Sequence, residues 1–177
     1  MTLDIPTLHT ERLTLRAFSA EDHGAFARME ADPGVREFRG GNTLDAGQAW
    51  TSMQLILGQW ALRGYGVFAL GDKARNSAFI GFAGVLHPAD FTEPELAYSL
   101  DRSYWGAGLA LEAAIAARAW AFSQHSFPLL VSFIAPANHR SKRVAAKLGA
   151  VHQSMTSIRG NPAERWVHAP PGRGVVA

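Results

Sequence analysis

Apolar and polar residues alternate near the start of the chain, over residues 12–18. Leu13, Leu15 and Ala17 fall on one side of this segment, and charged or hydroxyl side chains fall on the other. A period of two is typical of a strand with one buried face. The pattern therefore predicts a half-buried first strand.

Apolar residues spaced three and four apart predict helices elsewhere in the chain. In the second of these helices Met53 and Trp60 keep helical spacing, Asn42 or Thr43 is expected to be the N-cap, and Gly64 is expected to end the helix. The whole pattern predicts helices over 20–31, 43–63, 108–123 and 138–149, and strands over 12–18, 66–70, 78–86, 95–100, 129–134, 150–157 and 164–169.

The third predicted helix is rich in alanine. Leu111, Ile115 and Phe122 would form its apolar stripe, and the small side chains around them would let it lie close against a sheet. The strand at 129–134 is almost wholly apolar, as expected of a strand covered on both faces. We therefore expect a mixed α/β fold with a mixed sheet of about seven strands, flanked by four helices.

Composition excludes several classes of function. The 177 residues are 47% hydrophobic and carry a net charge of +2, which is typical of a globular protein and gives no basis for a nucleic-acid or membrane partner. There is no cysteine, so the chain has no disulfide, no thiolate nucleophile and no thiolate metal ligand. The histidines do not cluster at metal-ligand spacing, so no metal site is expected.

No signal peptide and no run of about 20 apolar residues is visible. We therefore expect a cytoplasmic protein. Residues 10–169 are expected to form one domain, and residues 170–177 a flexible tail. The sequence leaves a homodimer open.

A loop with two glycines joins the strand at 95–100 to the alanine-rich helix. Gly106 and Gly108 lie where the strand gives way to the helix. The first N–H groups of a helix lack intrahelical partners and carry partial positive charge, and glycine lets the backbone approach an anion closely. The loop is a candidate phosphate cradle, although glycines at such a place also make ordinary turns. It is neither a P-loop nor a G-x-G-x-x-G fingerprint, because Leu111 stands at the third glycine position.

A second stretch, Asn138-His-Arg-Ser-Lys-Arg-Val-Ala-Ala-Lys-Leu-Gly149, follows another apolar strand. The succession of strand, Trp-Gly-x-Gly-Leu-Ala helix, strand and Asn-x-x-Ser helix resembles the GNAT superfamily of N-acetyltransferases. It resembles most closely the RimJ/RimL-type branch, which modifies ribosomal-protein N-termini. The stretch Thr10-Glu-Arg-Leu-Thr-Leu-Arg16 also resembles the first strand of that branch. The resemblance runs from about Thr10 to His168.

The resemblance implies the acyl-CoA N-acyltransferase fold, acetyl-CoA as co-substrate and no metal. In this family the strand before the loop splays from its neighbour, and the pantetheine arm enters the gap. The residues expected to bind acetyl-CoA are Ser99, Leu100, Trp105, Gly106, Ala107, Gly108, Leu109, Ala110 and Asn138. The family's loop pattern begins with Gln or Arg, where this chain has Ser103. That departure removes one polar contact and leaves the backbone cradle intact.

Two residues match catalytic positions of the family. Glu95, at the start of the splayed strand, would be the general base, and Ser141, the serine of Asn-x-x-Ser, would protonate the leaving thiolate. Each residue also has a structural alternative: Glu95 could be a solvent-facing acid at the end of a strand, and Ser141 a residue of the first helical turn without a chemical role. Tyr98 is a rival proton donor that would also suit the core. Because no cysteine is available for an acyl-enzyme, we expect direct attack by the amine in a ternary complex.

The acceptor is expected to be a primary amine, and the branch favours the N-terminal amine of a protein or peptide. A lysine and a small amine such as an aminoglycoside or polyamine are alternatives, and a non-catalytic acyl-CoA-binding sensor is an alternative of another class. The segment 35–41 borders the acceptor site in the family. Its Gly40-Gly41 pair indicates mobility or an ordinary loop. The wider region 35–43 holds Arg36 and Arg39 against Glu37 alone, which argues against a polycation.

Overall fold

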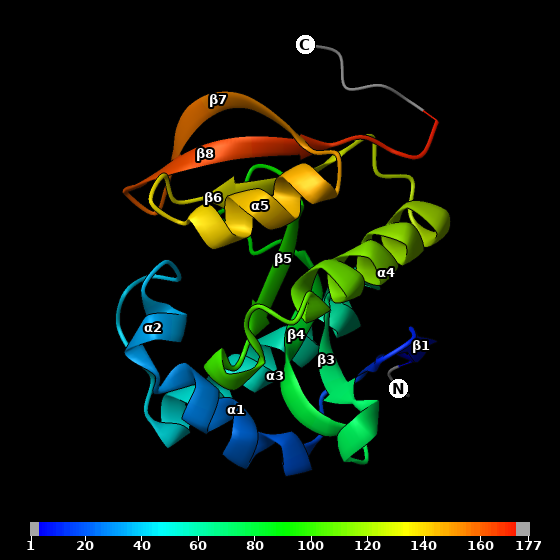
Figure 1. Cartoon of the computed structure of the whole chain (residues 1–177), viewed down its shortest axis with the longest axis vertical. Coiled ribbons are helices and arrows are strands. Elements are labelled where there is room, and N and C mark those ends of the chain that lie inside the picture. The colour runs from blue at the N-terminus through cyan, green and yellow to red at the C-terminus, as the bar shows by residue number, and fades with distance from the viewer. Residues whose placement is uncertain (1–3, 173–177) are drawn as a thin grey trace.

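The alternation at the start of the chain does form a strand, in which Leu13 and Leu15 are fully buried. It belongs to an eight-stranded mixed sheet in the computed structural model, which describes residues 4–172 (Figure 1). The strands are β1 (Leu8–His9), β2 (Leu13–Arg16), β3 (Val67–Asp72), β4 (Ala78–Leu86), β5 (Glu95–Leu100), β6 (Leu130–Ile134), β7 (Val151–Ile158) and β8 (Asn161–His168). The helices are α1 (His23–Glu30), α2 (Pro33–Arg36), α3 (Ala46–Arg63), α4 (Leu109–Gln124) and α5 (His139–Lys147), with 3-10 turns at Ala20–Asp22, Lys73–Arg75 and Arg102–Tyr104.

The strand order is β1-β2-β3-β4-β5-β6-β8-β7. All neighbours are antiparallel except β5 and β6, which are parallel. The mixed α/β fold is thus confirmed. The two elements beyond the predicted seven strands and four helices are the shortest of their kind, because β1 has two residues and α2 is a single turn.

Each face of the sheet carries its own hydrophobic core. Phe68, Ile80 and Leu96 belong to the core that includes the buried face of α4. Phe26 and Phe82 belong to the core beneath α1 and α3. Figure 1 shows α4 and α5 next to each other, while α1 and α3 pack together near the start of the sheet. Helices therefore cover both faces of the sheet, α4 on one face and α1 and α3 on the other.

The apolar stripe predicted for α4 is correct only in part, because Leu111 and Phe122 pack against the core at its edge but Ile115 does not. Ile115 is 49% exposed, and the buried face of the helix is made almost entirely of small residues. These residues are Leu109, Ala113, Ala114, Ala117 and Ala121. Alanines allow the helix backbone to lie close to β4 and β5, so close packing, and not the position of the large side chains, sets the helix rotation.

The predicted cap of α3 is wrong. Asp45, not Asn42 or Thr43, is the N-cap: its side chain accepts from the Gln48 N–H at 2.8 Å, and the Gln48 side chain accepts from the Asp45 N–H at 3.0 Å. This reciprocal capping box satisfies two backbone donors at once. The helix ends as predicted, with Gly64 in the left-handed conformation.

The predicted domain limits, 10–169, stay a prediction. The predicted tail lies outside the described residues from 173 onward. Over residues 4–172, no helix is both long and apolar enough to cross a membrane.

Candidate active site

The strands β5 and β6 diverge at the centre of the sheet. β5 pairs with β4 along its whole length, whereas its only pair with β6 is Glu95 with Val131. The Ser132 hydroxyl of β6 also donates to the Leu96 carbonyl of β5 at 2.8 Å. The structure therefore contains the splayed pair of strands that the sequence led us to expect.

Glu95 lies at the point where the two strands part, and its side chain is partly buried. One carboxylate oxygen accepts from the Phe133 N–H at 3.2 Å. Burial raises the pKa of Glu95 to about 7, and the Phe133 N–H, Arg159 and Arg39 limit the increase. A carboxyl group with this pKa is divided between its two protonation states at neutral pH, as a proton acceptor in catalysis should be.

Ser141 and Tyr98 form a hydroxyl pair on the other side of β5. The Ser141 hydroxyl donates to the Tyr98 hydroxyl at 3.1 Å, and Tyr98 donates to the Ser141 carbonyl at 3.0 Å. Asn138 caps α5 by accepting from the Ser141 N–H at 3.1 Å, which fixes the serine at the first turn. Burial raises the pKa of Tyr98 to about 12, so its hydroxyl keeps its proton.

The alternation of β5 separates these groups. Ala97, between Glu95 and Ser99, packs against the core beneath α1 and α3, whereas Tyr98 packs against the core beneath α4. Since successive strand residues point to opposite faces, the carboxyl of Glu95 and the hydroxyl pair flank the gap from opposite sides. The sequence left Tyr98 as a rival or core residue, and the structure places it in contact with Ser141.

The glycine loop presents backbone to solvent at the start of α4. Gly106 and Gly108 have φ of 82° and 80°, a left-handed conformation that favours glycine. An added Cβ at Gly106 would meet nothing within 4 Å. The hydrogen-bond ladder of α4 begins with the Glu112 N–H on the Gly108 carbonyl at 3.2 Å, so the preceding N–H groups, including that of Ala110, lie before it. The open, positively polarised loop fits a pyrophosphate.

Trp105 anchors this loop. Its ring N–H donates to the Leu100 carbonyl at 2.9 Å, and the Arg140 guanidinium lies 4.1 Å from the ring centre. Ala107 and Leu109 complete the loop, and Leu109 is buried, so only its backbone can meet a ligand. The predicted donor-site residues between Ser99 and Ala110 thus lie along one path, from the end of β5 to the start of α4, whereas Asn138 lies apart from them at the N-cap of α5.

The segment 35–41 is held in place by a cluster of salt bridges that was not predicted from the sequence. Glu30 is fully buried and binds Arg36 at 2.9 Å and Arg39 at 2.7 Å. Arg39 also donates to the Ser99 hydroxyl at 3.2 Å and lies 4.7 Å from the centre of the Phe82 ring. The two arginines are therefore partners of one buried carboxylate, with a net charge of +1, and Arg39 joins this segment to β5.

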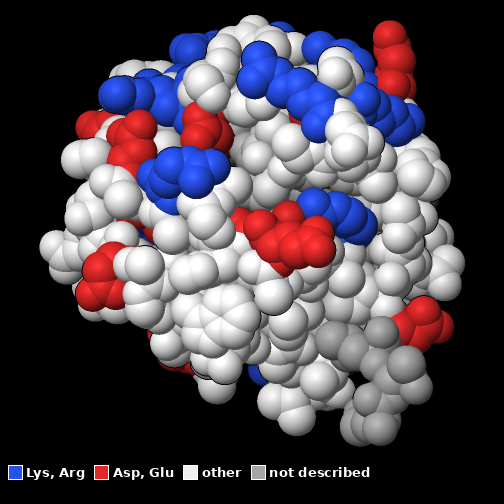
Figure 2. All heavy atoms as spheres, turned by 90° about the horizontal axis from the view of Figure 1, so that it is seen from below, with Lys and Arg blue, Asp and Glu red and all other residues white. Residues whose placement is uncertain are grey.

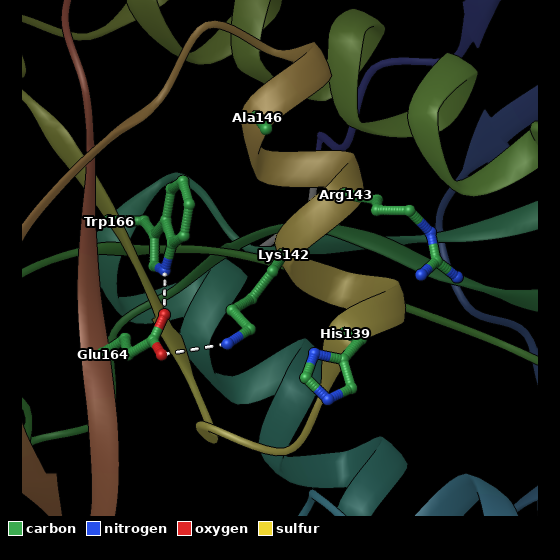
Figure 3. A pocket seen from close by; sticks show the side chains of 6 residues that line it. All are labelled: His139, Lys142, Arg143, Ala146, Glu164 and Trp166. Carbon is green, nitrogen blue, oxygen red and sulfur yellow. Dashed lines mark hydrogen bonds and ion pairs between the residues drawn. The ribbon is translucent and has the colours of Figure 1, made fainter.

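A separate hollow of about 470 Å³ lies between α5 and β8 (Figure 3). Lys142 binds Glu164 at 3.0 Å, and the Trp166 ring N–H donates to the same carboxylate at 3.0 Å. Figure 3 shows Arg143 pointing away from them, on the other side of the helix. The hollow contains none of the predicted site residues, so the candidate active site is the gap between β5 and β6.

Comparisons with known proteins agree with this geometry. A family model for the acetyltransferase (GNAT) domain matches residues 12–151. An acetyltransferase from Agrobacterium tumefaciens is similar with a TM-score of 0.83 and 31% identity, covering 95% of this chain and 96% of that one. A ribosomal-protein alanine acetyltransferase from Vibrio fischeri shares the fold, with a TM-score of 0.76, 17% identity and coverage of 95% and 98%.

A ribosomal-protein α-N-acetyltransferase, solved in complex with coenzyme A, also shares the fold, with a TM-score of 0.73, 13% identity and coverage of 90% and 95%. The family model spans most of the chain, and the Agrobacterium enzyme is similar over nearly all of it. The chain therefore belongs to the GNAT family and is an acetyl-CoA-dependent acetyltransferase.

Proposed function

We propose that this acetyltransferase modifies the α-amino group at the N-terminus of a protein or peptide. The observation that supports this most is the pKa of Glu95, which burial raises to about 7. A free α-amino group has a pKa of about 7.7–8.0, and a lysine amine about 10.4. A base of this strength takes a proton from the first far more readily than from the second near neutral pH.

In the proposed reaction Glu95 accepts a proton from the acceptor ammonium, directly or through a water. The neutral amine attacks the thioester carbonyl, a C–N bond forms and the C–S bond breaks. The Ser141–Tyr98 pair gives a proton to the departing sulfur. Two protons leave the nitrogen overall: one ends in solvent, and the other is balanced by the proton on the sulfur.

The charge around Glu95 supports an acceptor that is not a polycation. Arg39 and Arg159 are both close enough to Glu95 to lower its pKa. Arg159 is also paired with Asp90, at 2.7 and 3.0 Å. On the face seen in Figure 2, acidic side chains form small separate groups, and lysines and arginines gather mainly along the upper edge. That face offers no broad acidic surface for a polyamine or aminoglycoside.

The test is thiol release from acetyl-CoA with matched acceptors at pH 7. One set of peptides has a free N-terminus and no lysine, a second has a blocked N-terminus and one lysine, and a third set consists of small amines. We expect the free N-termini to give a kcat/KM at least about tenfold above the lysine peptides. A higher value for a small amine would overturn the acceptor proposal. CoA binding without thiol release from any acceptor would favour the sensor.

A further inference from the structure

The N-terminal stretch that resembles the family's first strand folds back onto the glycine loop. The Thr10 hydroxyl donates to Glu112 Oε1 at 2.6 Å, and the Arg12 backbone N–H donates to the same oxygen at 2.8 Å. The Arg12 side chain holds the other oxygen through Nε and Nη2, each at 2.7 Å. Its Nη1 donates to the Ala107 carbonyl at 2.9 Å. One arginine therefore joins the loop to the first turn of α4.

The two groups that Arg12 binds, the Glu112 carboxylate and the Ala107 carbonyl, would both repel a phosphate. Glu112 lies in the first turn of α4, where a carboxylate suits the helix dipole but repels a second anion at the same helix end. The hydrogen bonds from Thr10 and Arg12 outweigh burial and lower the pKa of Glu112, so this carboxylate is charged at neutral pH. The Ala107 carbonyl is the negative end of a peptide dipole within the cradle itself.

The position of Arg12 also places positive charge at the loop. A Cβ built on Gly108 would lie 3.7 Å from Arg12 Nη2, so the guanidinium borders the cradle. Anchoring the strand does not require this side chain, because Leu13 and Leu15 are fully buried and β2 pairs with β3 over four residues. The Arg12 side chain is 47% exposed, so it is not itself part of the hydrophobic core.

We infer that Arg12, held in place by Thr10 and Glu112, is a positioning residue of the donor site. It keeps the Ala107 carbonyl turned toward itself and neutralises Glu112, so that the N–H groups of the loop are what the acetyl-CoA pyrophosphate meets. This inference rests on the family's co-substrate and is independent of which amine is the acceptor.

The test compares a single and a double variant by calorimetric titration with CoA. Arg12→Gln exposes the Glu112 charge and frees the carbonyl, so we expect CoA binding to weaken on the order of tenfold. In Arg12→Gln with Glu112→Gln the repelling charge is gone, so we expect at least threefold of that loss to return. Arg63→Gln is the matched control, because Arg63 is exposed at the end of α3 and affects His87, at the opposite end of β4 from the loop.

Thermal unfolding of the same proteins separates positioning from folding. A positioning role predicts that the double variant regains CoA affinity without regaining Tm, since the contacts of the Arg12 side chain with Glu112 and the Ala107 carbonyl are still missing. If Arg12→Gln does not fold, Arg12→Lys replaces it: lysine keeps the charge but cannot reach both groups, and an intermediate loss is expected. Wild-type affinity in the Arg12 variant, or a double variant as weak as the single one, would overturn the inference. Failure of the wild type to bind CoA would instead count against the donor site as a whole.

Discussion

At the scale of single residues, the proposed chemistry depends on two groups flanking one strand. Glu95 lies on one side of β5, where it accepts from the Phe133 N–H, and Tyr98 contacts Ser141 on the other side. Their pKa values are both raised by burial, to about 7 and about 12. The same physical cause makes the carboxyl a base of useful strength and keeps the phenol a proton donor.

Replacement of the proposed base gives the first prediction. Glu95→Gln should lower kcat for a free N-terminal peptide on the order of 10²-fold at pH 7. The deficit should shrink toward pH 9, because the amine then loses its proton to solvent. A pH–rate profile at saturating acetyl-CoA measures this, with Glu37→Gln, an exposed acid in the acceptor-side segment, as control. A profile parallel to wild type at every pH would exclude Glu95 as the base.

The hydroxyl pair gives the second prediction. Ser141→Ala should lower kcat by roughly 10²-fold with little change in the Kd for CoA, because α5 is capped through the Ser141 backbone N–H and not its hydroxyl. Tyr98→Phe should have a similar effect, and the double variant should be no worse than either, since the two act as one unit. Single-turnover rates and CoA titrations are the measurements, with the exposed Ser154→Ala as control. Additive losses would mean that the hydroxyls act separately.

At the scale of elements, α4 packs closely against the sheet while the loop before it keeps its backbone accessible. The alanine face lets the helix approach the sheet, and the glycines let the loop adopt a left-handed backbone in front of the helix N-terminus. The alanine face therefore brings the start of α4 close to β5. The glycines leave the N–H groups of the loop accessible to an anion.

The loop gives the third prediction. Gly108→Glu should weaken CoA binding by at least about 100-fold, because a carboxylate would stand at the phosphate site. A side chain such as Glu or Gln at a φ of 80° costs roughly 1–2 kcal/mol of stability, so Gly108→Gln is the matched control: it carries the same backbone strain and bulk without the charge. We expect both variants to fold with similar Tm, and the Gln variant to bind CoA more tightly than the Glu variant. Equal affinities for CoA in the two variants would show that charge at this position is not what matters.

At the scale of the whole molecule, two titratable groups with shifted pKa values, His168 and Glu95, act on stability in opposite directions. His168 is 1% exposed and contacts the Ser132 hydroxyl at 3.0 Å; burial and Arg118 lower its pKa to about 4. The unfolded chain therefore binds the extra proton first, and stability is lost as the pH falls from about 6.5 to 4. Glu95 has a raised pKa, so its contribution to the stability of the folded protein is present at low pH. This stability is lost as the pH rises from about 4.5 to 7.

The fourth prediction follows from this opposition. In the wild type the two contributions largely cancel between pH 7 and 5. Glu95→Gln removes one of them, so its free energy of unfolding should fall by about 2 kcal/mol over this interval, and it should exceed the wild type by about 1–3 kcal/mol at pH 8. Urea unfolding at several pH values is the measurement, with Glu37→Gln expected to follow the wild type. A pH dependence shared by all three proteins would contradict the buried state of Glu95.

Much of the architecture could be predicted from the sequence because it depends on local interactions. The strand at Glu95–Leu100 and the helix stop at Gly64 agree with the structure, since alternation and a left-handed glycine act within a few residues. The cap formed by Asn138 on the N–H of Ser141 is also local, because it spans only three residues. The divergence of β5 from β6 was predicted only through the family resemblance.

Contacts between distant segments were decided by the tertiary structure alone. Tyr98 meets Ser141 across 43 residues, and Thr10 meets Glu112 across 102, distances over which no local pattern carries information. The exposure of Ile115 depends on how closely the alanine face of α4 packs on the sheet. The pKa of Glu95 depends on which segments bury it. Packing sets these properties because desolvation and helix rotation are properties of the assembled layers and not of any single stretch of chain.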